Sequence, residues 1–401
     1  MVVQPSLMRR FPTAMAMRQG ARTRLPKFSF EYMDGGAGDD TGINRNWSAL
    51  DAIEMFPRYG KVVSPPPTDI ELFGQHYSVP IGISPIGGPG TAWPGAEVYM
   101  ARAAQAARIP YTLGILSAIT IKQAVELAPD VLWLQLYRFA KNDHSIGFDL
   151  LDRAQNAGVK ALMLTIDTPV RSVRPREFRS GILHPFRMTN RLRFDALSSL
   201  PWFFALIRNG IPRFVNLRPY MNSNPTPAEA ANFMRQEGGG AFTWEEIARY
   251  RDRWKGPLIL KGVLHPEDAE LAVGLGVDGL MVTNHGGRQN EALPSAIDTL
   301  PAVAKQVNHR ATIILDSGVR SGTDVARSVA LGADAAFASK AFLWSLGAIG
   351  KKGPAHLIKI LQNELGATLG QLGCHTVSDL KSVLTRHPGA YQLEDFIISQ
   401  S

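Results

Sequence analysis

Short apolar runs alternate with amphipathic segments along the chain from Val79 onward. Runs of this length, bounded by Gly, Pro or Asp, are typical of strands that are buried on both faces of a parallel sheet. Eight strands are therefore predicted, at residues 79–87, 110–115, 131–137, 161–167, 257–263, 279–285, 312–318 and 335–340.

Segments with the 3.6-residue apolar period of a helix lie between these runs. They include 95–107, 147–158, 266–276 and 322–332, and the last three close on a glycine. Eight strand–helix repeats predict a (β/α)8 barrel. A doubly wound open sheet is the alternative, although no Gly-x-Gly-x-x-Gly turn follows the first predicted strand.

The regular spacing is interrupted once, between the fourth and fifth predicted strands. About ninety residues separate them, far more than one helix and its loops need. The fourth helix is assigned to 244–254, which leaves about 168–243 as an insertion after strand four. Its stretch SSLPWFFALIRNGIPRF joins aromatic and aliphatic residues to Arg208 and Arg213. This stretch is either a helix packed on the barrel or against another subunit, or an interfacial membrane anchor.

The length of 401 residues would allow two or three domains, but a (β/α)8 barrel of this size is expected to form one domain spanning 1–401. The single cysteine, Cys374, excludes a disulfide framework and a cysteine-based metal cluster, and it fits a reducing compartment. No stretch approaches the ~20 apolar residues that span a bilayer. Residues 1–27 lack acids and carry several arginines, but no apolar signal core follows, so a cleaved targeting peptide is not expected.

The positive charge is concentrated in one segment. The whole chain has a net charge of +8, and residues 171–219 alone hold ten arginines against Glu177 and Asp195. This segment therefore accounts for the entire excess, which indicates one surface for an anionic partner.

Polar side chains end six of the eight predicted strands, where an α/β barrel carries its chemistry. Branched apolar residues would be expected at these positions if they served packing alone. The polar strand-end residues are Gln135, Tyr137, Thr165, Asp167, Lys261, Thr283, His285, Asp316 and Lys340.

The stretch VTNHGGRQ (282–289) combines two complementary groups on one turn. His285 has the ordinary pKa of a general base near neutral pH, and Asp167 is placed to orient its ring. Arg288 presents a planar fork that binds a carboxylate through two hydrogen bonds. The segment 316–324, followed by ASK at 338–340, resembles a phosphate cradle after strands seven and eight. Together these groups suggest a small carboxylic acid that is oxidised against a phosphate-bearing cofactor.

The ordered motifs LQLY, TIDTP, LKGV, NHGGRQ and SGTDV resemble those of a known family. It is the family of FMN-dependent L-2-hydroxy acid oxidases and dehydrogenases, which includes glycolate oxidase, L-lactate dehydrogenase and mandelate dehydrogenase. The resemblance runs from about Leu25 to Leu380. It implies a (β/α)8 barrel with FMN at its mouth, no metal, and commonly a tetramer.

The resemblance also implies the role of each site residue. His285 is the base, Asp167 its partner, Lys261 a residue beside the flavin, and Tyr137 a residue beside the substrate. The implied substrate-binding residues are Tyr32, Arg174, Arg288, Tyr137 and Leu116. The implied FMN-binding residues are Ile86, Gly87, Gly114, Gln135, Thr165, Lys261, Thr283, Asp316, Ser317, Gly318, Arg320, Ser339 and Lys340.

Some positions depart from the family pattern. Ile86 removes a hydroxyl from the turn after strand one, and Ser317 stands where relatives have glycine. Lys340 replaces the phosphate-binding arginine, exchanging a fork for a point charge. Asn290 and Glu291 replace an expected Leu-Asp pair. Leu116 aligns with an active-site tryptophan of glycolate oxidase. These changes leave the substrate residues in place and bear on the strength of FMN binding.

The expected reaction is oxidation of an L-2-hydroxy acid to the 2-oxo acid, with His285 as base and flavin N5 as electron acceptor. Gly87 resembles the residue of membrane-linked dehydrogenases, which favours reoxidation by a quinone, with an electron-carrier protein as a second route. An oxygen-using oxidase that produces hydrogen peroxide is the alternative. The chain is expected in the cytoplasm, with peripheral contact to the inner face of the membrane through 196–219.

Other functions fit the residues less well. An FMN-barrel isomerase, or an enzyme of the IMP-dehydrogenase type, would not need His285 and Arg288 together with Tyr32 and Arg174. A basic nucleic-acid binder would explain the charge but not these residues, so no nucleic acid is expected as a partner.

Overall fold

A closed barrel of eight parallel strands lies at the centre of the computed structural model, which describes residues 5–60, 66–181, 189–221 and 225–396. The strands follow one another around the barrel in chain order, and the last pairs with the first. They are β4 (Ile81–Ile83), β5 (Tyr111–Gly114), β6 (Leu132–Leu136), β7 (Ala161–Thr165), β8 (Leu258–Val263), β9 (Gly279–Val282), β10 (Thr312–Leu315) and β11 (Ala335–Ala338). The predicted (β/α)8 barrel is confirmed, and the open sheet is excluded.

The barrel interior is filled by side chains of matched size. Every residue of β4, β5, β6 and β7 is buried, as the apolar runs predict. The rings of Trp133 and Phe337 lie 5.3 Å apart, and a Cβ on Gly82 would lie within 2.3 Å of the Phe337 ring. A glycine opposite a large ring therefore lets the interior close without a void.

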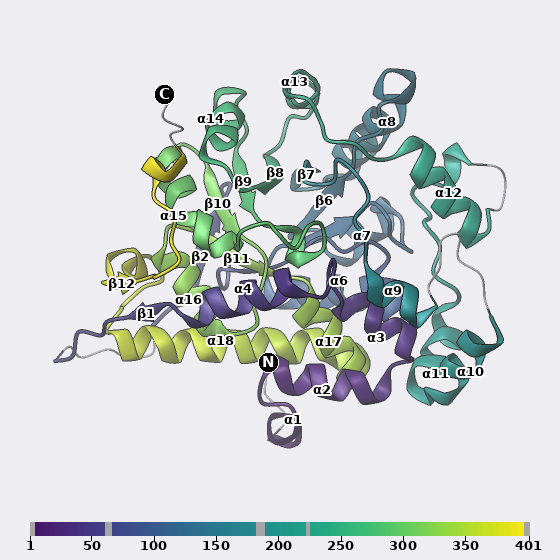
Figure 1. Cartoon of the computed structure of the whole chain (residues 1–401), viewed down its shortest axis with the longest axis horizontal. Helices are drawn as coiled ribbons and strands as arrows, with labels where there is room; N and C mark the ends of the chain where they lie inside the picture. Colours follow the sequence, from purple (N-terminus) through teal and green to yellow (C-terminus); the bar gives the residue numbers. More distant parts are fainter. Residues whose placement is uncertain (1–4, 61–65, 182–188, 222–224, 397–401) are drawn as a thin grey trace.

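One or more helices follow each strand and cover the outside of the barrel (Figure 1). The four predicted helices are all present, and the helix assigned to 244–254 is α13, which leads into β8. These covering helices are α6 (Ala96–Ala107), α7 (Ile121–Leu127), α8 (Lys141–Ala157), α13 (Trp244–Arg253), α14 (Pro266–Gly274), α15 (Ala296–Val307), α16 (Gly322–Ala330), α17 (Lys340–Ile349) and α18 (Gly353–Leu372).

An N-terminal segment precedes the barrel and reaches its mouth. Figure 1 shows α2 beside α17, and a Cβ on Gly347 of α17 would lie 2.7 Å from Ala21 of α2. Ile43 of α4 lies against Gly287, in the turn after β9. The segment comprises α1 (Pro5–Arg10), α2 (Ala14–Arg24), α3 (Lys27–Asp34) and α4 (Thr41–Asp51).

Small elements complete the chain around the barrel. Two antiparallel pairs form, β1 with β12 and β2 with β3. The remaining small elements are β1 (Glu54–Met55), β2 (Ile70–Leu72), β3 (Gln75–Tyr77), α5 (Pro89–Ala92), η2 (His285–Gly287), η3 (Gly350–Lys352), η4 (Ser378–Ser382), β12 (Thr385–Arg386) and η5 (Leu393–Phe396).

The insertion lies between β7 and α13, as predicted, and both ends of its central part are fixed to the barrel. Trp202 is buried, and its Nε1 donates to the carbonyl of Ala92 at 3.2 Å. Asn216 is fully buried; its Oδ1 accepts from the Ile121 amide at 3.0 Å, and its Nδ2 donates to Ser117 Oγ at 2.9 Å. The insertion elements are α9 (Pro175–Ser180), α10 (Asn190–Ser198), α11 (Leu200–Asn209), η1 (Arg218–Tyr220) and α12 (Pro227–Glu237).

Candidate active site

The carboxyl ends of the barrel strands open into a cavity of about 630 Å³. Side chains from the first, third, fourth, fifth, sixth, seventh and eighth strand ends line it, together with part of α3. Its lining residues are Tyr32, Met33, Ser84, Pro85, Ile86, Gly87, Gln135, Tyr137, Thr165, Lys261, His285, Arg288, Asp316, Ser339, Lys340 and Leu343. The predicted base, Arg288 and most predicted cofactor residues thus converge on one space.

His285 and Asp167 form the predicted pair in this cavity. His285 Nδ1 lies 2.9 Å and 3.0 Å from the two carboxylate oxygens of Asp167. Lys261 Nζ lies 3.5 Å from Asp167 Oδ2. A bulge in β8 brings the lysine and the aspartate together: Gly262 has a φ of +116°, and any Cβ there would lie 2.5 Å from the Asp167 side chain.

The hydrogen bond to Asp167 determines which imidazole nitrogen faces the cavity as a base. Lys261 Nζ also lies 3.1 Å from Nδ1, but both oxygens of Asp167 are closer to it. Because an ionised carboxylate only accepts hydrogen bonds, Nδ1 carries the proton and Nε2 keeps its lone pair. Burial lowers the pKa of His285 below its ordinary value, although Asp167 opposes this shift. Burial would raise the pKa of Asp167, but His285 and Lys261 outweigh it and keep that pKa low. The resting pair is therefore a neutral imidazole beside a carboxylate.

A pair of guanidinium groups lies close to the base. Arg288 donates through Nη1 to the carbonyls of Tyr32 at 2.9 Å and Gly35 at 2.6 Å, and through Nη2 to Glu177 at 3.0 Å. Arg174 donates to the Arg288 carbonyl and to the same Glu177 oxygen, both at 3.2 Å. Burial, and next the neighbouring Arg174, lower the pKa of Arg288 to about 10, so it remains a cation at neutral pH.

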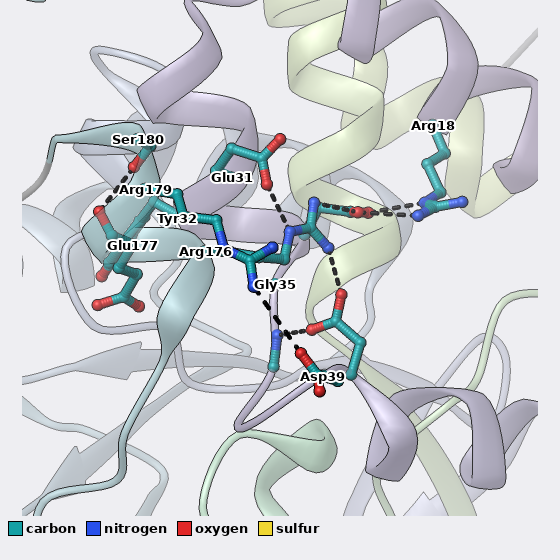
Figure 2. Close-up of polar contacts among 12 residues, drawn as sticks. Arg18, Glu31, Tyr32, Gly35, Asp39, Arg176, Glu177, Arg179 and Ser180 are labelled. Atoms are coloured by element: carbon teal, nitrogen blue, oxygen red, sulfur yellow. Dashed lines mark hydrogen bonds and ion pairs between the residues drawn. The ribbon is translucent and has the colours of Figure 1, made fainter.

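The sequence analysis missed two residues of α9 that organise this corner. Glu177 holds both guanidinium groups, and Arg176 points the other way, toward the N-terminal segment (Figure 2). Arg176 contacts Glu31, Asp34 at 3.0 Å and Asp40 at 2.6 Å. The sequence did contain a signal for Glu177. It is one of only two acids among the ten arginines of residues 171–219, which indicates that it pairs with specific arginines.

Asp34 connects this corner to both ends of the chain. Arg18 binds it through two hydrogen bonds of 2.7 Å and 2.8 Å, and Trp344 Nε1 donates to it at 3.0 Å. Arg18 and Arg176 outweigh the effect of burial and lower the pKa of Asp34. The backbone carbonyls of Tyr32 and Gly35, in this same segment, accept hydrogen bonds from Arg288. Arg176 and Arg18 therefore fix the position of the segment that supports Arg288.

The predicted flavin-contacting residues form hydrogen-bonded sets on the cavity wall. Gln135 Nε2 donates to Thr165 Oγ1 at 2.9 Å. Asp316 accepts from Ser84 at 2.6 Å and from Thr283 at 2.8 Å. Amide, hydroxyl and ammonium groups on one wall suit the polar edge of a heteroaromatic ring.

A second cavity of about 370 Å³ adjoins the first and shares Asp316, Ser339 and Lys340 with it. It is also lined by Ser317 and Gly318. Lys340 begins α17 and donates to the carbonyls of Asp34 and Gly35, both at 2.9 Å. An ammonium group has three donors, so one remains for a further acceptor. Burial lowers the pKa of Lys340 well below its ordinary value, and a phosphate beside it would favour the charged ammonium. A lysine at the start of a ten-residue helix suits a phosphate, so the residues of the two cavities suit FMN.

Three residues that were predicted to bind the cofactor also contact other parts of the protein. Gly114 lies behind the turn after β4, where a Cβ would be 2.7 Å from the Ile86 carbonyl oxygen. Ser317 has a φ of +96°, and its Oγ accepts from the Gly286 amide at 2.9 Å, so this hydroxyl supports the His285 turn. Arg320 pairs with Asp51 and lies over the ring of Trp47, which lines the second cavity.

Leu116 and Glu291 are two further positions where the chain departs from the family pattern, and the structure shows their contacts. A Cβ on Gly87 would lie 3.7 Å from Leu116, which places this predicted substrate residue next to the turn after β4 that was predicted to bind FMN. Glu291 accepts a hydrogen bond from the Asp39 amide at 3.0 Å. The exchange at position 291 therefore ties the loop after His285 to the N-terminal segment.

Known proteins are similar to this chain in sequence and in architecture. The family model described as FMN-dependent dehydrogenase matches residues 21–387. The L-lactate dehydrogenase of Pectobacterium atrosepticum is 35% identical over 366 residues, covering 91% of this chain and 94% of that protein. The L-lactate dehydrogenase of Caulobacter sp. (strain K31) is 36% identical over 371 residues, covering 92% and 97%.

Solved structures give the same result. The monotopic membrane protein (S)-mandelate dehydrogenase superposes with a TM-score of 0.87 at 29% identity, over 92% of this chain and 97% of that one. A mandelate oxidase with (S)-4-hydroxymandelic acid superposes with a TM-score of 0.80 at 28% identity, over 94% and 99%.

Proposed function

The chain belongs to the family of FMN-dependent dehydrogenases, and we propose that it oxidises an L-2-hydroxy acid to the 2-oxo acid with His285 as the base. It is an FMN-dependent oxidoreductase that acts on a CH–OH group. The observation that carries the proposal is the juxtaposition of the His285–Asp167 pair with the Arg174–Arg288 pair around one cavity. A base beside a carboxylate clamp suits a substrate with a hydroxyl and a carboxylate on adjacent carbons.

Each residue has a defined task in this reaction. Arg288 and Arg174 bind the carboxylate and so fix the adjacent carbon near His285. Burial raises the pKa of Tyr137 to about 12, so its hydroxyl stays protonated and would donate a hydrogen bond to the substrate. His285 Nε2 accepts the proton that the substrate loses, and Asp167 stabilises the imidazolium that forms. Bound FMN supplies the two-electron acceptor that no side chain of this cavity provides.

The residues that would hold FMN are those of the two adjoining cavities. Gln135, Thr165 and Lys261 would face the ring, and Asp316 would face the ribityl chain. Lys340, with Arg320 nearby, would compensate the phosphate charge.

Anaerobic bleaching of the yellow holoenzyme tests the proposal. Glycolate, lactate, mandelate and longer 2-hydroxy acids would be added in turn, and at least one should remove the visible flavin absorption. The lactate and mandelate enzymes among the relatives make these two acids the first to try. A flavin that no 2-hydroxy acid reduces would contradict the proposal.

We further propose that a membrane quinone reoxidises the flavin, because the insertion exposes an apolar face. Residues of α10, α11 and the chain just after α11 form this face at helical spacing, and each is at least half exposed. The apolar face consists of Phe194, Leu197, Leu200, Phe204, Ile207 and Ile211.

Arginines accompany these apolar residues along the chain. Arg191, Arg193, Arg208 and Arg213 lie on the same two helices or just beyond them. An apolar face accompanied by arginines matches an anionic lipid surface. Among the helices that the structure describes, none is long and apolar enough to cross a bilayer, so contact would be peripheral.

The acceptor is tested by comparing rates of flavin reoxidation. A quinone analogue in anionic vesicles should reoxidise the reduced enzyme much faster than air-saturated buffer does. Rapid reoxidation by oxygen with formation of hydrogen peroxide would instead support the oxidase, and reoxidation only by an acidic carrier protein would support that route.

A further inference from the structure

Arg174 and Arg288 form the substrate clamp, and Glu177 neutralises one of their two guanidinium groups. Its carboxylate is 10% exposed and contacts Arg174 at 3.2 Å and Arg288 at 3.0 Å through the same oxygen. Arg174, Arg288 and Glu177 together therefore carry a single positive charge. That charge matches one substrate carboxylate.

The hydrogen-bonding capacity of the clamp agrees with this count. Arg288 has five N–H donors, and three of them reach acceptors within the described part of the chain. Two donors of Arg174 are likewise engaged. The clamp thus keeps enough donors for one carboxylate even though Glu177 is present. Glu177 limits the charge of the clamp without closing it.

The other charges around the cavity are also compensated. Lys261 pairs with Asp167 at 3.5 Å, and His285 beside them is neutral. Arg176 faces Glu31, Asp34 and Asp40 and turns away from the cavity. Lys340 donates to two uncharged carbonyls, and the phosphate of bound FMN would compensate its charge.

In the described part of the chain, two further cations lie on this side of the clamp: Arg171 near Arg174, and Arg235 near Arg171. Both are exposed, so water and salt screen their charges. A second carboxylate in the cavity would therefore lose its hydration without gaining a buried partner, which is costly.

We propose that Glu177 is a specificity-determining residue that restricts the site to acids with one carboxylate. It acts through Arg174 and Arg288 and touches no reacting atom. This inference rests on the proposed function, because it assumes that the two arginines bind the substrate carboxylate. It adds the substrate class: monocarboxylic 2-hydroxy acids are accepted, and acids with a second carboxylate next to the reacting carbon are rejected.

Propionate and malonate test the inference in the FMN-loaded enzyme. Malonate carries a carboxylate where propionate carries a methyl group, and neither has a hydroxyl that the enzyme could oxidise. Dissociation constants would be measured by calorimetry and by the change in the flavin absorption spectrum. The native enzyme should bind propionate at least tenfold more tightly than malonate. Equal binding of the two would overturn the inference with no variant needed.

Three variants separate charge from shape. Glu177→Gln keeps the shape and removes the charge, so the ratio of the two constants should move about tenfold toward malonate. Glu177→Asp keeps the charge and should leave the ratio within threefold of the native value. Glu31→Gln removes a carboxylate from the Arg176 side of the same corner and should also leave the ratio within threefold.

The outcomes can be told apart. An unchanged ratio in Glu177→Gln, or an equal change in Glu177→Asp, overturns the role of the charge while bleaching by hydroxy acids still stands. If Glu177→Gln does not retain flavin, the native enzyme decides the question, because equal binding of propionate and malonate overturns the inference. An enzyme that binds neither probe and is bleached by no hydroxy acid contradicts the proposed function itself.

Discussion

His285 and Asp167 are hydrogen-bonded across the mouth of the barrel, although 118 residues separate them in the chain. Asp167 follows β7, and His285 follows β9, with Lys261 on the strand between. The aspartate fixes the proton on Nδ1 and leaves Nε2 as the base. This hydrogen bond therefore bears on both the rate of the reaction and its dependence on pH.

Replacing His285 by glutamine should slow flavin reduction by about 10²–10⁴-fold, the usual contribution of a positioned base. Stopped-flow measurement of anaerobic bleaching gives the rate. The protein should remain yellow, because the residues that would hold FMN are unchanged. A variant that reduces flavin within tenfold of the native rate would remove the base assignment.

The acid side of the pH profile should fall at a lower pH than an ordinary histidine would give. Burial lowers the pKa of His285 from its usual value near 6.5, and the reaction needs the neutral form. Activity should therefore be retained just below pH 6.5 and be lost only as the pH falls through the lowered pKa. The profile of kcat/KM against pH measures this. A midpoint above pH 7 would contradict the burial effect.

Asp167→Asn should both slow the reaction and move its profile further toward acid. The asparagine no longer stabilises the imidazolium, and Asp167 is the group that opposes the lowering of the His285 pKa. A loss of about 10²–10⁴-fold in kcat is expected for a base whose tautomer is no longer fixed. Rate and midpoint should change together; a slower enzyme with an unmoved midpoint would mean that Asp167 serves packing alone.

Arg176→Gln should weaken substrate binding and lower stability. It would leave Glu31, Asp34 and Asp40 short of a cation, and breaking such a part-buried network costs about 3 kcal/mol. Urea unfolding measures stability, and KM should rise more than kcat falls because Arg288 rests on the same segment. Arg179→Gln is the matched control: Arg179 lies on the same helix but is 74% exposed and 3.9 Å from Asp39. Equal effects in the two variants would refute the bracing role of Arg176.

Replacing both Phe204 and Ile207 by serine should abolish sedimentation with anionic vesicles and leave turnover on an artificial acceptor intact. Both side chains are more than 60% exposed, so little folding energy is lost. Leu271→Ser on α14 removes an exposed leucine elsewhere and should not change binding. A native protein that ignores such vesicles would end the anchor proposal.

These substitutions are a sharper test than deletion of 196–219. That deletion would also remove Trp202 and Asn216, whose buried hydrogen bonds attach the insertion to the barrel. A loss of activity after deletion would then report a damaged fold as well as a missing anchor.

The barrel was predictable because its strands are almost entirely buried and because apolar residues recur with a helical period between them. The site residues at the strand ends followed from the same pattern, since the carboxyl ends of parallel strands meet at one mouth. Gly114 was assigned to the cofactor by position, and only the structure shows that it packs behind Ile86.

The N-terminal segment and α9 could not be placed in the same way. Their roles depend on long-range ion pairs, such as Arg176 with Asp34 and Glu177 with Arg288, which leave no periodic signal in the chain. The charge composition indicated that an anion binds near 171–219, but several of these arginines form ion pairs within the protein. Arg174 pairs with Glu177, which also pairs with Arg288, and Arg176 pairs with three acids.

Asp34 receives a hydrogen bond from Trp344, 310 residues further along the chain. During synthesis, the clamp cannot assume its final shape until almost the whole polypeptide has left the ribosome, because contacts between distant segments form late. Flavin retention should therefore mark completed molecules, and a prematurely terminated chain would emerge colourless even with most of its barrel made.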